Sequence, residues 1–229
     1  MKKSGFNIKY FRKEEIALWI ISIALILISF FVFDKTNYLT LVASIIGETS
    51  LIFCAKGNPI GQFLMIIFSV LYGFISYNFA YYGEMITYVG MTGPMAVISF
   101  ISWLRHPYKG NKSQVKINQI PKKEWFFMIV LSAVVTYIFY YILKFFNTAN
   151  LIPSTISVTT SFAAVYLTFR RSVFYALLYA LNDLVLIVLW TMAALSDISY
   201  ISVLICFIAF FINDLYGFIN WSRMEKKQK

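Results

Sequence analysis

Three carboxylate residues lie inside long apolar runs of this sequence: Glu48, Asp183 and Asp214. An amide residue precedes two of them, Asn182 before Asp183 and Asn213 before Asp214. An ionisable side chain within a membrane-spanning segment is costly unless it faces a cavity or a polar partner, so such residues are functional candidates. Carboxylates attract cations, and amides both donate and accept hydrogen bonds. The pattern predicts a polar binding site for a small solute inside a membrane.

Aromatic side chains supply the second part of the predicted site. Flat rings stack on flat heterocycles and bind cations through their negative faces. In one apolar run, rings and polar groups follow helical spacing along one side: Tyr175, Tyr179, Asn182, Asp183, Leu186 and Trp190. Tyr72 and Tyr88, from two other runs, are candidates for the opposite wall. Because the chain has 16 Tyr and 23 Phe, most of its rings are expected to pack against protein or lipid.

The elements that must hold these residues are membrane helices. Of 229 residues, 60% are hydrophobic and 13% charged, whereas about 25% are charged in an average soluble domain. A bilayer core of ~30 Å needs about 20 helical residues. Continuous apolar runs favour helices over the alternating pattern of a barrel. Eight runs are long enough: 17–33, 39–55, 60–80, 85–103, 125–146, 152–169, 172–195 and 198–221.

The basic residues predict how these spans are oriented. The net charge is +10, but Lys and Arg lie in short segments between apolar runs, which indicates topology and not nucleic-acid binding. With eight spans, 18 of the 20 basic residues fall on one side, leaving only Lys35 and Lys144 on the other. Both termini are therefore predicted to be cytoplasmic, in a cell membrane. The basic loop 105–123 is expected to contact phospholipid headgroups of the bilayer.

The order of the spans predicts an all-α, polytopic arrangement of one extra helix, three helices, a connector helix and three helices. Segments 69–84 and 182–197 can be aligned, each ending a span on an acid. An odd connector gives two parallel repeats, and transporters commonly hold substrate near the midplane where repeats meet. Span 17–33 shows no polar group at mid-depth and is expected to lie outside the site. The expected units are 1–38 (tail and extra helix), 39–103 (first repeat), 104–151 (basic loop and connector) and 152–229 (second repeat and tail).

Other functions of the same residues stay open at this point. Asp183 and Asp214 could form the carboxylate dyad of an intramembrane enzyme, although no local motif accompanies them. A scaffold or receptor without transport is a further alternative, but it does not explain polar groups at mid-depth in both halves. Cys54 and Cys206 lie in apolar runs and His106 in the basic loop, without metal or redox spacing. No metal ion or cofactor is expected.

Several segments together resemble the PnuC family of nicotinamide riboside transporters. They are SVLYGFISY (69–77), YYGEM (81–85), the spacing from Pro94 to Trp103, WLRHPYKGNKSQVK (103–116) and NDLYGFINWSR (213–223). The resemblance covers residues from about 40 to the C-terminus. It implies two three-helix repeats related to the SWEET fold, a homotrimer, and substrate held at mid-membrane. It also implies facilitated diffusion of unphosphorylated nicotinamide riboside, a vitamin precursor for NAD biosynthesis, followed by trapping through cytoplasmic phosphorylation.

The sequence also departs from the family pattern. Ala96 stands where many relatives carry Gln, and Tyr175 and Leu178 stand where relatives carry Trp. Either the ligand contacts have shifted to Asn213 and Asp214, or the substrate is another vitamin such as thiamine, with proton coupling as a further alternative. For nicotinamide riboside, the rings of the predicted site would stack on the cationic pyridinium. A carboxylate would balance its charge.

Overall fold

A computed structural model describes residues 10–78, 82–148 and 150–229. Within these ranges, eight helical segments are long and apolar enough to cross a membrane, which confirms the predicted number of spans. Residues 1–9 of the basic tail and the predicted end of the third span at 79–80 lie outside the described residues. In chain order the helices are α1 (Lys13–Ser29), η2 (Phe30–Asp34), α2 (Tyr38–Ala55), α3 (Pro59–Asn78), α4 (Tyr82–Thr87), η3 (Tyr88–Thr92), α5 (Gly93–Arg105), α6 (Lys122–Phe145), α7 (Leu151–Phe169), α8 (Tyr175–Ala194), η4 (Ile198–Tyr200) and α9 (Ile201–Gln228).

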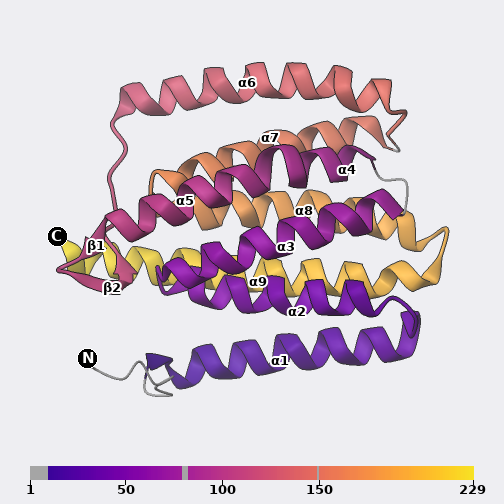
Figure 1. The fold of residues 1–229 in the computed structure, drawn as a ribbon, viewed down its shortest axis with the longest axis horizontal. Coiled ribbons are helices and arrows are strands. Elements are labelled where there is room, and N and C mark those ends of the chain that lie inside the picture. The colour runs from indigo at the N-terminus through magenta and orange to yellow at the C-terminus, as the bar shows by residue number, and fades with distance from the viewer. Residues whose placement is uncertain (1–9, 79–81, 149) are drawn as a thin grey trace.

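Six of the helices form a closed ring. α2 packs on α3 and α9, α3 packs on α5, α5 on α7, α7 on α8, and α8 on α9. The other two long helices lie on opposite flanks, α1 beside α2 and α9, and α6 beside α7 (Figure 1). Only 22% of the most apolar part of the first span and 17% of the α6 span are buried within the chain, against 61% for α2. The ring encloses the interior, and α1 and α6 stand outside it.

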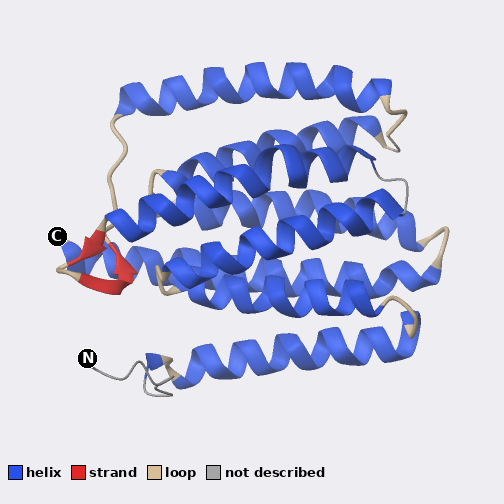
Figure 2. Ribbon diagram, viewed as in Figure 1, coloured by secondary structure: helices blue, strands red, loops and turns tan. Residues whose placement is uncertain are grey.

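Both described chain ends lie at one end of the bundle, beside a small hairpin (Figures 1 and 2). The hairpin pairs β1 (Pro107–Tyr108) with β2 (Asn111–Val115) in antiparallel fashion. Val115 is fully buried, and its N–H donates to the Gly57 carbonyl at 2.8 Å. Part of the predicted basic loop therefore folds back onto the helices. We call this the basic end, because it carries the loops rich in Lys and Arg.

The observed helix ends differ from the predicted ones where polar residues continue or interrupt a helix. α8 begins at Tyr175 and not at 172, because the preceding residues form a turn in which Arg171 has a φ of 56°. α9 continues to Gln228, beyond the predicted end at 221, because its basic last residues remain helical outside the apolar stretch. Hydrophobicity marks the part of a helix that lipid can cover, not the whole helix.

The fourth span is irregular in its middle, and the irregularity turns two side chains inward. Pro94 has no N–H, and its ring would clash with the carbonyl four residues earlier in a regular helix. The π-helical turn η3 lies immediately before it and widens the helix there. Tyr88 and Thr92, both in η3, are buried. This turn supplies one wall of the interior.

α1 is held to the ring by a buried polar cluster at the basic end. Glu15 is fully buried and lies 3.1 Å from the Lys56 ammonium of the α2–α3 turn. The Tyr216 hydroxyl of α9 donates to Glu15 at 2.9 Å. An ionised group taken out of water needs such partners. The cluster fixes the position of the first helix along α2 and α9.

Candidate functional site

A small cavity lies inside the ring, about midway along the helices. Its volume is about 30 Å³, enough for about two water molecules. Helices α2, α3 and η3 form one wall and α7, α8 and α9 form the other. Its lining residues are Leu51, Met65, Phe68, Tyr88, Thr92, Ser161, Tyr179, Asn182, Asp183, Phe207, Phe210 and Asp214. Five of the ten predicted site residues, Tyr88, Tyr179, Asn182, Asp183 and Asp214, thus meet at one place.

Asn182 is fixed by hydroxyl groups of α7. Its Oδ1 accepts hydrogen bonds from Ser157 Oγ at 3.1 Å, Thr160 Oγ1 at 2.9 Å and Ser161 Oγ at 3.0 Å. Three donors on the oxygen set the orientation of the amide plane. The amide nitrogen therefore points away from these donors, as a hydrogen-bond donor held in a defined direction.

Asp183 and Asp214 form a carboxyl pair across the α8–α9 interface. The two side chains interact electrostatically and line the same cavity, and their exposed fractions are 4% and 5%. Asp183 Oδ2 is buried and has no hydrogen-bond partner among the described residues. A buried polar atom without a partner is unfavourable, so this oxygen marks a place for a donor or a cation that a ligand supplies.

Aromatic rings form the wall that faces the carboxyl pair. Tyr88 lies edge-on to Phe68 with ring centroids 5.9 Å apart, and Phe68 lies 5.7 Å from Phe210 of α9. Gly47 of α2 makes room for them: a Cβ there would lie 2.6 Å from Phe210 and 2.9 Å from Phe68. The rings are therefore packed in place by the helix behind them.

Five of the predicted site residues lie outside the lining of this cavity, and four of them pack around it. Tyr72 packs behind Tyr88, with ring centroids 4.4 Å apart. Tyr175 packs nearer the basic end, 4.7 Å from the ring of Trp221. Glu48 is fully buried beside Asn213, and neither of its oxygens has a hydrogen-bond partner of good geometry among the described residues. These residues support the cavity from behind.

The expectation that the extra helix contributes no mid-depth polar group is wrong. Ser22 of α1 is 3% exposed and accepts a hydrogen bond from Asn213 Nδ2 at 3.0 Å. Ser22 also lies next to Glu48. A single serine in an apolar run is easily overlooked, because serine is tolerated on lipid-facing and packed surfaces alike. α1 therefore completes the layer behind the cavity, although it does not line it.

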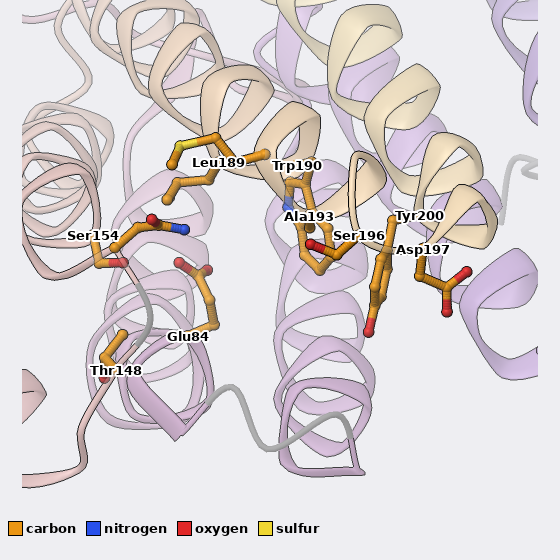
Figure 3. A pocket seen from close by; sticks show the side chains of 11 residues that line it. Glu84, Thr148, Ser154, Leu189, Trp190, Ala193, Ser196, Asp197 and Tyr200 are labelled. Carbon is orange, nitrogen blue, oxygen red and sulfur yellow. The ribbon is translucent and has the colours of Figure 1, made fainter.

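A second, larger cavity lies at the other end of the bundle, opposite the basic end, and we call it the vestibule (Figure 3). Its volume is about 350 Å³, within the range of small-molecule sites. Trp190, the tenth predicted site residue, lines the vestibule and stacks on Phe207 of the inner cavity at 6.4 Å and 12°. The stacked rings of Trp190 and Phe207 thus lie between the two spaces. The lining residues are Glu84, Thr148, Asn150, Ser154, Leu189, Trp190, Met192, Ala193, Ser196, Asp197 and Tyr200.

Comparison with known proteins identifies the family to which this chain belongs. Residues 37–223 match the family described as "Nicotinamide mononucleotide transporter". The chain belongs to this family. Family membership makes the protein a transporter and removes the enzyme alternative.

Sequences and a solved structure of relatives align with most of the length of this transporter. It is 26% identical to the nicotinamide riboside transporter PnuC of Neisseria mucosa over 92% of this chain and 82% of the relative. It is 22% identical to the protein of the same name from Haemophilus influenzae, over 83% of this chain and 82% of the relative. The solved structure titled "Crystal structure of the Vitamin B3 transporter PnuC" superposes with a TM-score of 0.83 at 23% identity, covering 96% of this chain and 94% of that one.

Sequence reasoning missed several residues that line the cavity of this transporter. Phe207, Phe210 and Asp214 share one face of α9 at helical spacing, which is a signal the sequence contained. The spacing was not decisive, since any Phe among 23 in a membrane helix can face lipid. Phe68 precedes Ser69, but one serine beside an apolar residue did not distinguish this ring from the other Phe residues. The contribution of these Phe side chains to the cavity is seen only in the packed structure.

Proposed function

We propose that this chain carries nicotinamide riboside across the cell membrane, bound between the aromatic wall and the Asp183–Asp214 pair. The observation that carries the proposal is the unpartnered, buried Asp183 Oδ2 facing packed rings in the closed cavity. The riboside has a cationic aromatic ring, a carboxamide and hydroxyl groups. A carboxylate, a ring stack and an oriented amide are the groups that would bind it. Both relatives named above are nicotinamide riboside transporters by name.

The charge of the cavity favours the riboside over the mononucleotide of the family description. The cavity lining includes Asp183 and Asp214, and no Lys, Arg or His belongs to the lining among the described residues. A phosphate group carries negative charge and is usually bound by Arg or Lys. Carboxylates in a dry site would repel it. The unphosphorylated, positively charged form is the species this site suits.

Each lining group has a role in the proposed complex. The Asp183 carboxylate balances the charge of the pyridinium ring. The aromatic rings of Tyr88 and Phe68 stack on the pyridinium ring. The Asn182 amide binds the carboxamide or a ribose hydroxyl. Tyr179 and Asp214 complete the polar wall. Glu48, Tyr72, Tyr175 and Asn213 hold these groups in position from the layer behind.

Transport requires the two walls of the cavity to separate. A space of about 30 Å³ is far smaller than the roughly 300–1,000 Å³ of a typical ligand site, so the cavity must widen for a ligand to enter. Rocking of the helices α2–α5 against α7–α9 would open it alternately to each end. The proposed process is facilitated diffusion with cytoplasmic termini, a homotrimeric assembly and trapping by cytoplasmic phosphorylation.

Uptake into liposomes that contain only the purified protein tests the function. Labelled nicotinamide riboside, nicotinamide mononucleotide and thiamine are supplied separately, with protein-free liposomes as the control. We expect the riboside alone to enter, up to equal concentrations inside and outside. If none of the three solutes enters, the carrier proposal is overturned. If thiamine enters preferentially, the transported vitamin is thiamine and not nicotinamide riboside. If a proton gradient drives accumulation of the riboside, transport is coupled to protons through the carboxyl pair and is not facilitated diffusion.

A further inference from the structure

The vestibule has its own carboxylates, and the cavity described above does not use them. Glu84 of α4 and Asp197 before η4 lie on opposite sides of it (Figure 3). None of the lining residues, among those the structure describes, is Lys, Arg or His. The two acids are the residues that the aligned segments 69–84 and 182–197 each end on. Two positions that match in sequence therefore contribute to one space.

Glu84 is oriented toward a ligand that the protein itself does not provide. Its carboxylate points into the space between Ser154 and Trp190 (Figure 3). Its Oε2 is shielded from solvent and has no hydrogen-bond partner among the described residues, and the same holds for Thr148 Oγ1 nearby. Buried polar atoms are usually paired, so two unpaired ones facing one cavity indicate that a donor or a cation binds there.

Asp197 supplies a second, exposed negative charge. The Ser199 backbone N–H donates to Asp197 Oδ1 at 2.9 Å and holds the pKa of that carboxyl below its ordinary value. The group therefore stays ionised at neutral pH. Low-dielectric walls around such charges focus their field toward the cavity.

Aromatic rings and polar side chains complete the vestibule. Trp190 and Tyr200 lie with ring centroids 5.6 Å apart, and Asn150, Ser154 and Ser196 provide amide and hydroxyl groups. A ring face attracts a cation within about 6 Å of its centroid. The vestibule thus combines the same three kinds of group as the inner cavity, in a space more than ten times larger by volume, about 350 Å³ against 30 Å³.

We propose that the vestibule is a second binding site, for an organic cation with an aromatic ring, and that it holds the transported solute before the solute passes Trp190. This inference rests on the proposed transport of a cationic riboside. Its position supports the order of events, because the Trp190 indole contacts the vestibule on one side and Phe207 of the inner cavity on the other. A solute would pass from one site to the other by displacing these two stacked rings.

Equilibrium binding of labelled nicotinamide riboside to the purified, full-length protein tests the site. In Asp183→Asn, where the inner site is disabled, we expect one weak site to remain, and its affinity should fall as salt is added, because salt screens exposed charges. Adding Glu84→Gln and Asp197→Asn to this variant should weaken the remaining binding at least about tenfold and remove its salt dependence. Asp197→Asn keeps an oxygen to accept from Ser199, so the local turn is preserved.

A matched control and the contrary outcomes separate this inference from the proposed function. Asp34→Asn removes one negative charge from the same end of the bundle, outside the vestibule lining, and should leave the weak site unchanged. No residual, salt-sensitive binding in Asp183→Asn overturns the vestibule site while wild-type uptake still supports the carrier. Absence of riboside binding and uptake in the wild type overturns the proposed function itself. If Glu84→Gln does not fold, Asp197→Asn alone must still weaken the residual site.

Discussion

The two walls of the inner cavity differ in chemistry although each comes from a set of three spans. Helices α2, α3 and η3 contribute apolar and aromatic side chains, with hydroxyl groups at Tyr88 and Thr92 and no acid or amide. Helices α7, α8 and α9 contribute Ser161, Asn182, Asp183 and Asp214, together with Tyr179 and two Phe rings. A site between two such walls distinguishes a flat cation from a neutral or anionic solute, because the ring and the charge are recognised from opposite sides.

The difference extends to how each wall is stabilised. Asn182 on the polar wall is held by three hydroxyl groups of α7. Tyr88 on the aromatic wall is held by packing against Phe68 and Tyr72, in a helix turn widened ahead of Pro94. Hydrogen bonds orient a polar group, whereas close packing fixes a ring. Substitutions on one wall therefore test hydrogen-bonded support, and substitutions on the other test support by packing.

The largest expected effect comes from the charge of the polar wall. Asp183→Asn keeps the shape of the side chain but removes the negative charge that faces the ligand cation. Loss of a buried charged partner weakens binding by about 2–5 kcal/mol, so riboside uptake into liposomes should fall by about 100-fold or more. Glu14→Gln, an exposed acid at the start of α1, is the charge-matched control and should transport normally. Normal affinity in Asp183→Asn would remove this residue from the site.

The next largest effect is expected at glycines where two helices pack closely, and each set of three spans contains one. A Cβ at Gly61 of α3 would lie 2.6 Å from the Cys54 backbone nitrogen, whereas a Cβ at Gly217 of α9 would lie 3.4 Å from Ala176. Gly61→Ala should therefore destabilise the protein by about 1–3 kcal/mol through overpacking. Gly217→Ala should be close to neutral. Thermal unfolding in detergent measures both, and equal melting temperatures would contradict the difference in packing.

The aromatic wall should respond to loss of a ring and not to loss of a hydroxyl. Tyr88→Leu removes the ring that is proposed to stack on the pyridinium, a contact that contributes about 1 kcal/mol. The KM for riboside should rise about fivefold. Tyr88→Phe retains the ring and should stay near the wild-type value. If Tyr88→Phe were as impaired as Tyr88→Leu, the hydroxyl and not the stack would be the contact.

The smallest expected effect tests the support of the polar wall. Thr160→Val replaces the hydroxyl that donates to Asn182 Oδ1 at 2.9 Å with a methyl group of the same shape. One such bond between membrane helices contributes about 0.6 kcal/mol, so the KM should rise about threefold while expression and melting temperature stay unchanged. The control is Thr155→Val, about one turn earlier, whose hydroxyl donates to the Leu151 carbonyl of the same helix and makes no other hydrogen bond among the described residues. No difference between the two variants would mean that Asn182 needs no orientation from α7.

Much of the architecture was predictable, because a membrane imposes simple rules on sequence. Eight continuous apolar runs predicted eight spans, and the structure contains eight. Mid-depth Asp183 and Asp214 predicted a polar interior, and both line the cavity. The exact ends of helices were less predictable, since α9 continues to Gln228 through charged and polar residues beyond the apolar run.

The long apolar runs, with acids and amides near their middle, were enough to predict a membrane-spanning chain with a polar interior, because polar groups are costly in lipid. Which of those polar groups contact one another follows from the packing of the helices. In the closed ring of six helices, Phe207, Phe210 and Asp214 of α9 line one cavity with the aromatic side chains of α3 and η3. Asn213 of α9 donates a hydrogen bond to Ser22 of α1. Such contacts depend on how helices rotate and pack, and helical spacing gives a face but not its partner.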